Sequence, residues 1–190
     1  MFRNFIIAAA PLALFAAPAA AQTVTGTIDM TGTVAAKCFV VPTNGSTFTD
    51  SVNFSALDQA NGTLRTGLAT DFGTRNYTVK CNGTNPKLAI TANVLATATP
   101  VTTGYDNSID FSATVSVDAT GANATTATPA AFTDSSTTVG GTTATAVGSS
   151  LANAANNIHI STTGYATNTA TDLLAVGTYT GSVVVTISPT

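Results

Sequence analysis

The sequence predicts an all-β fold, an antiparallel β-sandwich of about seven or eight short strands. Three observations lead to this fold class. Only 8% of the 190 residues are charged and the nine acids are all Asp, so the chain has little of the Glu, Lys and Arg that favour exposed helix faces. Thr, which is β-branched and favours strands, is abundant. Apolar and polar residues alternate in several segments, which is the periodicity of a strand with one buried face.

Residues 1–21 have the pattern of a secretory signal peptide. Arg3 supplies the positive start, residues 5–17 form an apolar stretch, and Ala19-Ala20-Ala21 fits the small-residue cleavage rule. The stretch is shorter than the roughly 20 apolar residues of a membrane span. We therefore expect an exported mature chain that begins at Gln22, has no membrane span, and resides in the periplasm, at the cell surface or outside the cell.

The mature chain opens with a strictly alternating segment, residues 24–34. One face is apolar or small and consists of Val24, Gly26, Ile28, Met30, Gly32 and Val34, whereas the other face is Thr and Asp. This pattern predicts a strand. Period two alone leaves two interpretations open, because the first strand of a complete monomeric sandwich and a strand donated to another chain have the same pattern.

Further strands are predicted in order along the chain, at residues 38–41, 51–55, 76–81, 87–95, 108–118, 157–161 and 179–187. In 51–55 the inward side chains are Val52 and Phe54. The expected inward faces of three others are Leu88, Ile90, Ala92 and Val94; Ile109, Phe111, Ala113, Val115 and Val117; and Tyr179, Gly181, Val183, Val185 and Ile187. Pro189 ends the last strand, because proline cannot donate to a ladder.

Residues 119–156 differ from the rest, since they are rich in Thr, Ala, Gly and Ser and contain few large apolar residues. They form either a hairpin that turns at Gly140-Gly141 or a long surface excursion. We treat them as an insertion in a sandwich domain of residues 34–190, preceded by an N-terminal extension at residues 22–33.

The two cysteines, Cys38 and Cys81, are expected to form a disulfide. An exported protein meets an oxidising compartment, where disulfides persist. A zinc site needs four ligands at short spacings, and the chain has only two cysteines and one histidine.

Composition and motifs argue against several functions. Six basic residues and a net charge of -3 do not provide the cationic surface that nucleic acids require. No motif joins His159 to a nucleophile and an acid, so we expect no enzyme, no catalytic residue and no cofactor. Asp106, Asn107 and Asp110 do not have EF-hand spacing and are explained as turn residues, so no metal site is expected.

Three parts of the chain resemble bacterial pilins of the chaperone–usher type. Residues 26–40 are similar to their N-terminal extension running into the first strand and first cysteine, and Cys81-Asn82-Gly83-Thr84-Asn85-Pro86 is similar to the archaic, spore-coat-U-like branch. Gly177-Thr178-Tyr179-Thr180-Gly181, followed by residues 183–187, is similar to their last strand and also to other exported bacterial β-domains of unknown function. The resemblance covers about half of the chain, whereas the ending Ile187-Ser188-Pro189-Thr190 lacks the aromatic residue usual in pilins.

The resemblance implies an immunoglobulin-like sandwich that lacks one strand, which the extension of the next subunit would supply. Val24, Ile28 and Met30 would then fill pockets, and Gly26 and Gly32 would permit close approach. The implied partners are other copies of this chain or related subunits, a periplasmic chaperone and an outer-membrane usher. The expected function is a structural subunit of a surface filament or coat, assembled by strand addition.

A monomeric extracellular module that binds carbohydrate or a surface is the alternative function. Such a module uses exposed aromatic side chains, for which the mature chain offers Tyr77, Tyr105, Tyr165 and Tyr179 and no Trp.

Overall fold

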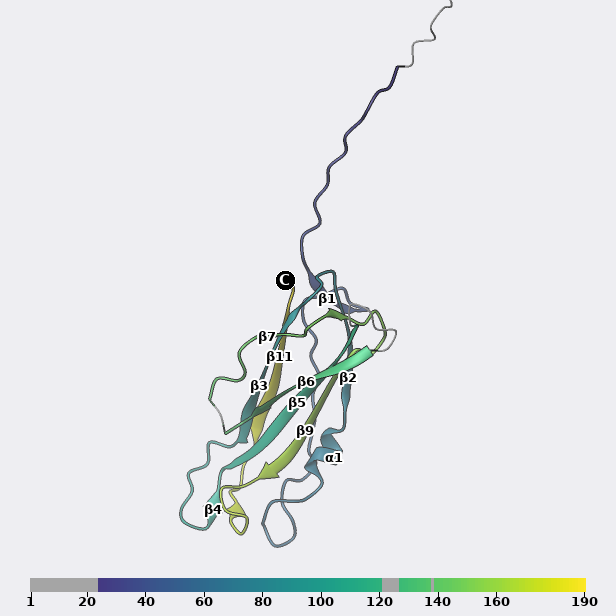
Figure 1. Cartoon of the computed structure of the whole chain (residues 1–190). Coiled ribbons are helices and arrows are strands. Elements are labelled where there is room, and N and C mark those ends of the chain that lie inside the picture. Colours follow the sequence, from purple (N-terminus) through teal and green to yellow (C-terminus); the bar gives the residue numbers. More distant parts are fainter. Residues whose placement is uncertain (1–23, 121–126, 138) are drawn as a thin grey trace, which may run out of the picture. The chain divides into compact units, whose positions relative to one another are not determined.

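The computed structural model describes residues 24–120, 127–137 and 139–190. The predicted signal peptide at residues 1–21 and its cleavage site before Gln22 lie outside these residues. The described part confirms the predicted fold class, an immunoglobulin-like antiparallel β-sandwich with one disulfide (Figure 1). It divides into a folded domain that begins at Ala35 and the segment 24–34, which is described separately.

Eleven strands and one short helix make up the described elements. They are β1 (Cys38–Val41), α1 (Leu68–Phe72), β2 (Arg75–Cys81), β3 (Lys87–Ala96), β4 (Tyr105–Asp106), β5 (Ser108–Thr120), β6 (Ala127–Ser135), β7 (Thr145–Ala146), β8 (Ser150–Leu151), β9 (Ile158–Ala166), β10 (Leu173–Leu174) and β11 (Thr180–Ser188). None of the described helices is long and apolar enough to cross a membrane.

One sheet contains most of these strands, and it folds over so that it nearly closes. Its strand order is β1-β2-β9-β5-β3-β11, with β6 and β8 paired to β5 and β7 paired to β3. β3 and β5 share only two registered pairs, Leu95↔Ile109 and Ala96↔Ser108. Because the ladder between them is so short, the long halves of β3 and β5 are free to face each other across the core.

The core lies between these strands and consists of the alternating apolar residues of the sequence. In β5 every second side chain from Ile109 to Ala119 is buried, which matches period two. Leu88, Ile90 and Ala92 of β3 and Ile158 and Ile160 of β9 complete the same cluster. The predicted inward faces of β3 and β5 are thus observed, with one exception at Val94.

The exception arises from a β-bulge in β3. The pairing of β3 with β11 passes from Ser182↔Asn93 to Thr180↔Ala96, so β3 has one residue more than its partner at this point. The extra residue reverses the alternation, and Leu95 is buried in place of Val94. The assignment of Val94 to the inward face was wrong for this reason.

Part of the predicted insertion belongs to the sheet. β6 pairs with β5 over nine registered positions, from Ser112↔Ser135 to Thr120↔Ala127. Residues 121–126, between these two strands, lie outside the described residues. Gly140-Gly141, where the sequence predicted a possible hairpin turn, follows β6 rather than joining it to β5, and both glycines have positive φ. β6 also reaches β3, because the amide of Ala92 donates to Oδ2 of the buried Asp134 at 2.8 Å.

The segment 51–55, which alternation predicts to be a strand, pairs with no strand in the part of the chain that the structure describes. Val52 and Phe54 are half-buried as expected, and their neighbours Ser51, Asn53 and Ser55 are exposed. The strand prediction was wrong because a sheet needs a neighbour as well as a pattern, and the space beside this segment is open.

The segment 24–34 is an extended chain without assigned secondary structure (Figure 1). Val24, Ile28 and Met30 are 88%, 87% and 90% exposed, and a methyl group added at Gly26 or Gly32 would meet no atom within 4 Å. These five donor-strand candidates are therefore accessible, although their predicted role remains a prediction.

Candidate functional site: an apolar groove beside the last strand

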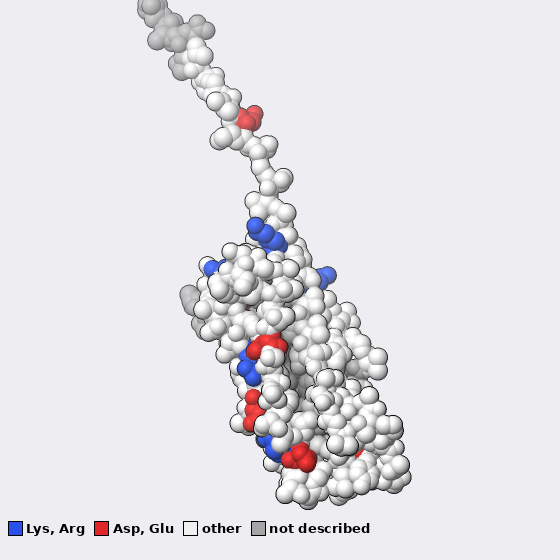
Figure 2. All heavy atoms as spheres, turned by 180° about the vertical axis from the view of Figure 1, so that it is seen from behind, with Lys and Arg blue, Asp and Glu red and all other residues white. Residues whose placement is uncertain are grey.

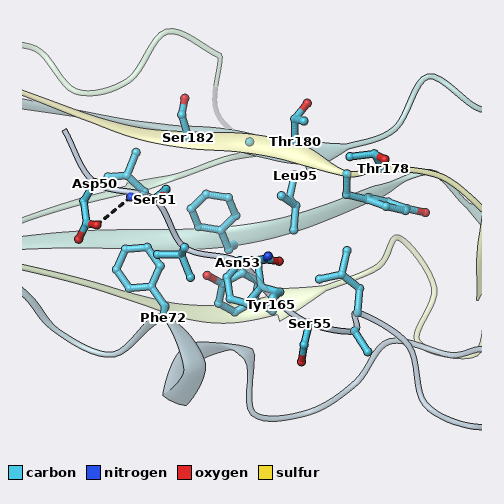
Figure 3. A pocket seen from close by; sticks show the side chains of 18 of the residues that line it. Asp50, Ser51, Asn53, Ser55, Phe72, Leu95, Tyr165, Thr178, Thr180 and Ser182 are labelled. Atoms are coloured by element: carbon cyan, nitrogen blue, oxygen red, sulfur yellow. Dashed lines mark hydrogen bonds between the residues drawn. The ribbon is translucent and has the colours of Figure 1, made fainter.

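A groove of about 990 Å³ runs along one side of the domain. One side is the groove wall, which we define as residues 48–58, and the other is residues 177–183, which lead into β11. Figure 3 shows the cavity between these two segments, with Thr180 and Ser182 pointing away from it and Leu95 pointing into it.

The floor of the groove is apolar and aromatic. Leu95, Phe111 and Ile160 are less than a tenth exposed, and Tyr165 stacks on Phe111 with ring centroids 5.3 Å apart. The side chains of Val52, Phe54 and Leu57 reach the same space from the groove wall. An occupant would therefore meet a continuous apolar surface, and each large apolar side chain that it buried would contribute about 1.5–3 kcal/mol.

β11 forms an open sheet edge along the groove. Among the described residues β11 pairs only with β3. The amides of Ala92 and Ile90 donate away from β11, to Asp134 and Thr142, so their opposite residues Val183 and Val185 are the non-hydrogen-bonded positions of the ladder. The main-chain N–H and C=O groups of Val183, Val185 and, two residues on, Ile187 therefore point to the free side of the strand.

The groove wall also has free main-chain groups. From Phe48 to Ser55, no main-chain group bonds to the main chain of another described strand, and the amide of Ser51 donates only to the neighbouring Asp50 carboxylate at 2.8 Å. Main-chain pairing begins at Leu57, whose carbonyl accepts from the amide of Arg65. The groove thus has unpaired main chain on both sides and an apolar floor between them.

A polar and aromatic cluster fixes the start of the groove wall. The ring of Phe48 stacks on Tyr77 at 4.2 Å, and the Tyr77 hydroxyl donates to Asp50 at 3.3 Å. Arg75 Nη1 lies 3.6 Å from Asp50 Oδ2, and its guanidinium lies over the ring of Phe72. Burial, the Asp50 charge and this hydrogen bond raise the pKa of Tyr77. The cluster therefore ties the first residues of the wall to β2.

Within the described residues, Arg75 Nε is the buried side-chain polar atom that has no hydrogen-bond partner. Arg75 lies opposite Ile160 in the β2–β9 ladder, so its side chain leaves the sheet on the core side and reaches the groove.

The beginning of β11 is fixed by Tyr179 and Asp106. The Tyr179 hydroxyl lies 3.0 Å from the carbonyl oxygens of both Asp106 and Ala175 and can donate to them. The Asp106 carboxylate, only 6% exposed, accepts from the amides of Asn168 and Ser108. Asp106 thus serves as a loop clamp, which agrees with its interpretation as a turn residue.

Of the predicted residues of the last strand, Tyr179, Gly181 and Val183 line the groove, and Val185 and Ile187 lie further along β11. Val183, Val185 and Ile187 are half-buried against the core, and Tyr179 precedes β11. Gly181 lies against the β3 bulge, where an added Cβ would stand 2.9 Å from the Leu95 Cα. Sequence reasoning missed the role of the groove wall, although the alternation of Val52 and Phe54 was the available signal.

The other candidate residues lie away from the groove. Cys38 and Cys81 form the predicted disulfide, which joins β1 to β2 at their first registered pair. His159 faces away from the core, and its Nδ1 and Nε2 lie 2.7 Å and 3.4 Å from oxygens of Asn76 and Asp118. No group of three or more metal-ligating side chains occurs among the described residues.

Three of the four tyrosines do not form an exposed aromatic surface. Tyr77, Tyr165 and Tyr179 are half-buried in the contacts described above, and only Tyr105, at 48%, is well exposed. No observation therefore favours a carbohydrate-binding platform. The face in Figure 2 has few charged groups: basic side chains lie apart from one another near one end of the domain, and the remaining charged side chains follow a line along it, which leaves most of that face uncharged.

The fold and the groove define the class of this protein as a disulfide-bonded, immunoglobulin-like domain with an open sheet edge beside an apolar groove. Comparison with protein-family models, with curated proteins and with solved structures finds no match.

Proposed function

We propose that this protein is a non-enzymatic structural subunit of a surface filament or coat, in which the N-terminal extension of one copy fills the groove of the next. The observation that carries the proposal is the open groove, with unpaired main chain on both sides and an apolar floor. A strand that entered it would pair with β11 and present every second side chain to the floor, which is the mode of β-augmentation.

The extension supports this choice of occupant. It alternates strictly, its apolar side chains are exposed, and it contains no proline that would remove a ladder hydrogen bond between Val24 and Val34. Ile28 and Met30 would face the floor, and the Thr face would remain toward water. Burial of these side chains lowers the free energy of the system, and the groove of a second copy offers an apolar surface that can bury them.

Contacts of this kind link copies head to tail. The donating segment and the accepting groove are different surfaces of one chain, so the interface is heterologous and builds a filament unless the rotation closes a ring. The proposal also places the mature chain in an oxidising compartment outside the cytoplasm, where the Cys38–Cys81 disulfide persists. Related subunits, a periplasmic chaperone and an outer-membrane usher are further proposed partners.

Deletion of residues 22–32 tests the proposal. We expect a folded monomer that no longer forms SDS-resistant ladders, whereas the full mature chain forms ladders that collapse on boiling. If the deletion instead unfolds the domain, the segment is an intramolecular strand and the subunit function is wrong. A single monomeric species of the full mature chain would also contradict it.

A matched pair of double substitutions tests whether the apolar face of the extension enters the groove or whether the presence of the extension alone is enough for assembly. Ile28→Asp with Met30→Asp places charges on the apolar face and should abolish the ladders, because burial of an unpaired carboxylate is costly. Thr27→Asp with Thr31→Asp alters the opposite face by the same charge and should preserve them. Equal effects of the two pairs would show that the apolar face does not enter a groove.

A further inference from the structure

We propose that the Cys38–Cys81 disulfide and the side chain of Asn82 form a tension anchor, which carries load from the extension directly into β2 and β3. This inference rests on the proposed function, since load enters through the extension only if neighbouring copies hold it. The tension anchor consists of Ala35, Lys37, Cys38, Cys81 and Asn82.

Asn82 holds the point at which the extension joins the domain. Its Oδ1 accepts from the amide of Lys37 at 2.7 Å, and its Nδ2 donates to the carbonyl of Ala35 at 2.9 Å. Its own amide donates to the carbonyl of Lys37 at 3.1 Å. One residue therefore makes three hydrogen bonds to residues 35–37, immediately before β1 begins.

The disulfide follows in the next position. It joins Cys38 and Cys81, the first registered pair of β1 and β2. β1 has only four residues and is the terminal strand of the sheet order, so without these links its short ladder alone would bear the pull. With them, load passes across a covalent bond and reaches β2 before it reaches the rest of β1.

From Cys81 the load has a short route to the groove. Residues 82–86 connect Cys81 to β3, and this loop is held by the amide of Gly148, which donates to Asn85 Oδ1 at 2.8 Å. The hydroxyl of Thr190, just beyond β11, donates to the Asn85 carbonyl at 3.0 Å. β3 then pairs with β11 over eight registered positions, and β11 borders the groove. Tension between successive copies would therefore cross the β3–β11 ladder and leave β5, β6 and β9 unloaded.

Single-molecule pulling of the mature chain tests the tension anchor without requiring assembly. One handle is placed at the N-terminal end of the extension and the other replaces the exposed Ser182 in β11, so the load follows the proposed route. At constant force we expect Asn82→Ala to shorten the folded lifetime by about tenfold, the factor that corresponds to about 1.4 kcal/mol. The control Asn76→Ala removes an amide that bonds to His159 at the far end of β2 from Cys81, away from the path that leads through residues 82–86 to β3. It should change the lifetime by less than about twofold, in line with a surface substitution.

Two more arms distinguish an anchor from a general stabiliser. When the first handle is moved to Lys80 of β2, load bypasses residues 35–38, and Asn82→Ala should then have no greater effect than Asn76→Ala. The double variant Cys38→Ser with Cys81→Ser should release an early extension step at low force, before the remainder unfolds. Because that variant can fail to fold, the comparison of Asn82→Ala with Asn76→Ala tests the tension anchor without it.

Equal lifetimes of the Asn82→Ala and Asn76→Ala variants in the first geometry would overturn the tension anchor. An undiminished Asn82→Ala effect in the Lys80 geometry would do the same, because the residue would then act on global stability alone. Failure of the proposed function is a separate result, namely the absence of ladders from the full mature chain.

Discussion

At the scale of single residues, Gly181 illustrates how closely the groove edge is packed. A Cβ at this position would lie 2.9 Å from the Leu95 Cα and the Val94 carbonyl oxygen, both of which belong to the main chain of the β3 bulge. We expect Gly181→Ala to destabilise the domain by about 1–3 kcal/mol, as overpacked sites do. Urea denaturation measures this, with Gly26→Ala as the control because its Cβ would meet open space. Equal stability of the two variants would show that the bulge can move aside.

Asn157 provides a second test at this scale. It is fully buried, its Oδ1 accepts from the amide of Val79 at 2.8 Å, and its Nδ2 donates to the carbonyls of Val79 and Ala152. Asn157→Ala leaves these groups without a partner, at a cost of about 1–3 kcal/mol for each buried group. We expect a lower midpoint in urea with an unchanged slope, and no change for the exposed Asn153→Ala. A normal midpoint would mean that water replaces the amide.

Residue-scale prediction from the sequence succeeded where period two and burial agree. Ile109 to Val117 alternate as predicted because β5 is regular and lies in the middle of the sheet. The prediction that Val94 faces inward was wrong because the bulge adds one residue to β3, and no local sequence pattern predicts this bulge. Sequence reasoning did not single out Asn157, because its three partners are main-chain groups of Val79 and Ala152, which only the fold brings to its side chain.

At the scale of elements, Asp106 controls the loops that precede β5 and β11. Burial raises the pKa of its carboxyl, but hydrogen bonds from Asn168, Ser108 and Asn107 outweigh burial and leave the pKa below its ordinary value. The folded pKa is therefore lower than the unfolded pKa of about 3.9. The stabilisation is fully present above the unfolded pKa and is lost as pH falls through the folded pKa.

The corresponding experiment compares the wild-type chain with Asp106→Asn in urea at pH 6 and at steps down to pH 2. We expect the wild type to be more stable at pH 6, and the gap in unfolding free energy to narrow below about pH 4, because protonation then makes the two side chains alike. A gap that stays constant over this range would mean that the charge of Asp106 contributes nothing to the clamp.

Element-scale prediction depended on whether a strand has a partner in the same chain. The segments that became β2, β3, β5, β9 and β11 were found because each has large apolar residues at period two. β6 was assigned to an insertion, since it offers only Phe132 as a large apolar anchor. Residues 51–55 have the pattern but pair with no described strand, and the space that a partner strand would occupy is part of the groove. The sequence therefore predicted one side of the groove, the strand β11. The other side, the groove wall, could be recognised only from the fold.

At the scale of the whole molecule, the disulfide should contribute a large share of stability. It closes a loop with a sequence separation of 43 residues, for which the chain-entropy model gives about 4 kcal/mol. Equilibrium unfolding in urea, with and without a reductant that opens the bond, measures the difference. The Cys38→Ser/Cys81→Ser variant should match the reduced protein, and a loss below about 1 kcal/mol would contradict the prediction.

The last prediction treats the domain as one half of an interface. The chain that lacks residues 22–32 presents the groove without an extension of its own, and a synthetic peptide of residues 23–34 supplies the proposed occupant. A ligand that binds only the folded state stabilises it by about 2.7 kcal/mol at a concentration 100 times its Kd. We therefore expect the melting temperature to rise with peptide concentration.

A peptide with Ile28→Asp and Met30→Asp is the control, and it should leave the melting temperature unchanged, because its charged side chains would face Leu95 and Phe111 on the groove floor. Main-chain hydrogen bonds to the free edge of β11 are available to both peptides, so the difference between them isolates the burial of the apolar face. If both peptides stabilise the domain equally, the groove takes any extended chain, and the alternation of residues 24–34 does not select the partner.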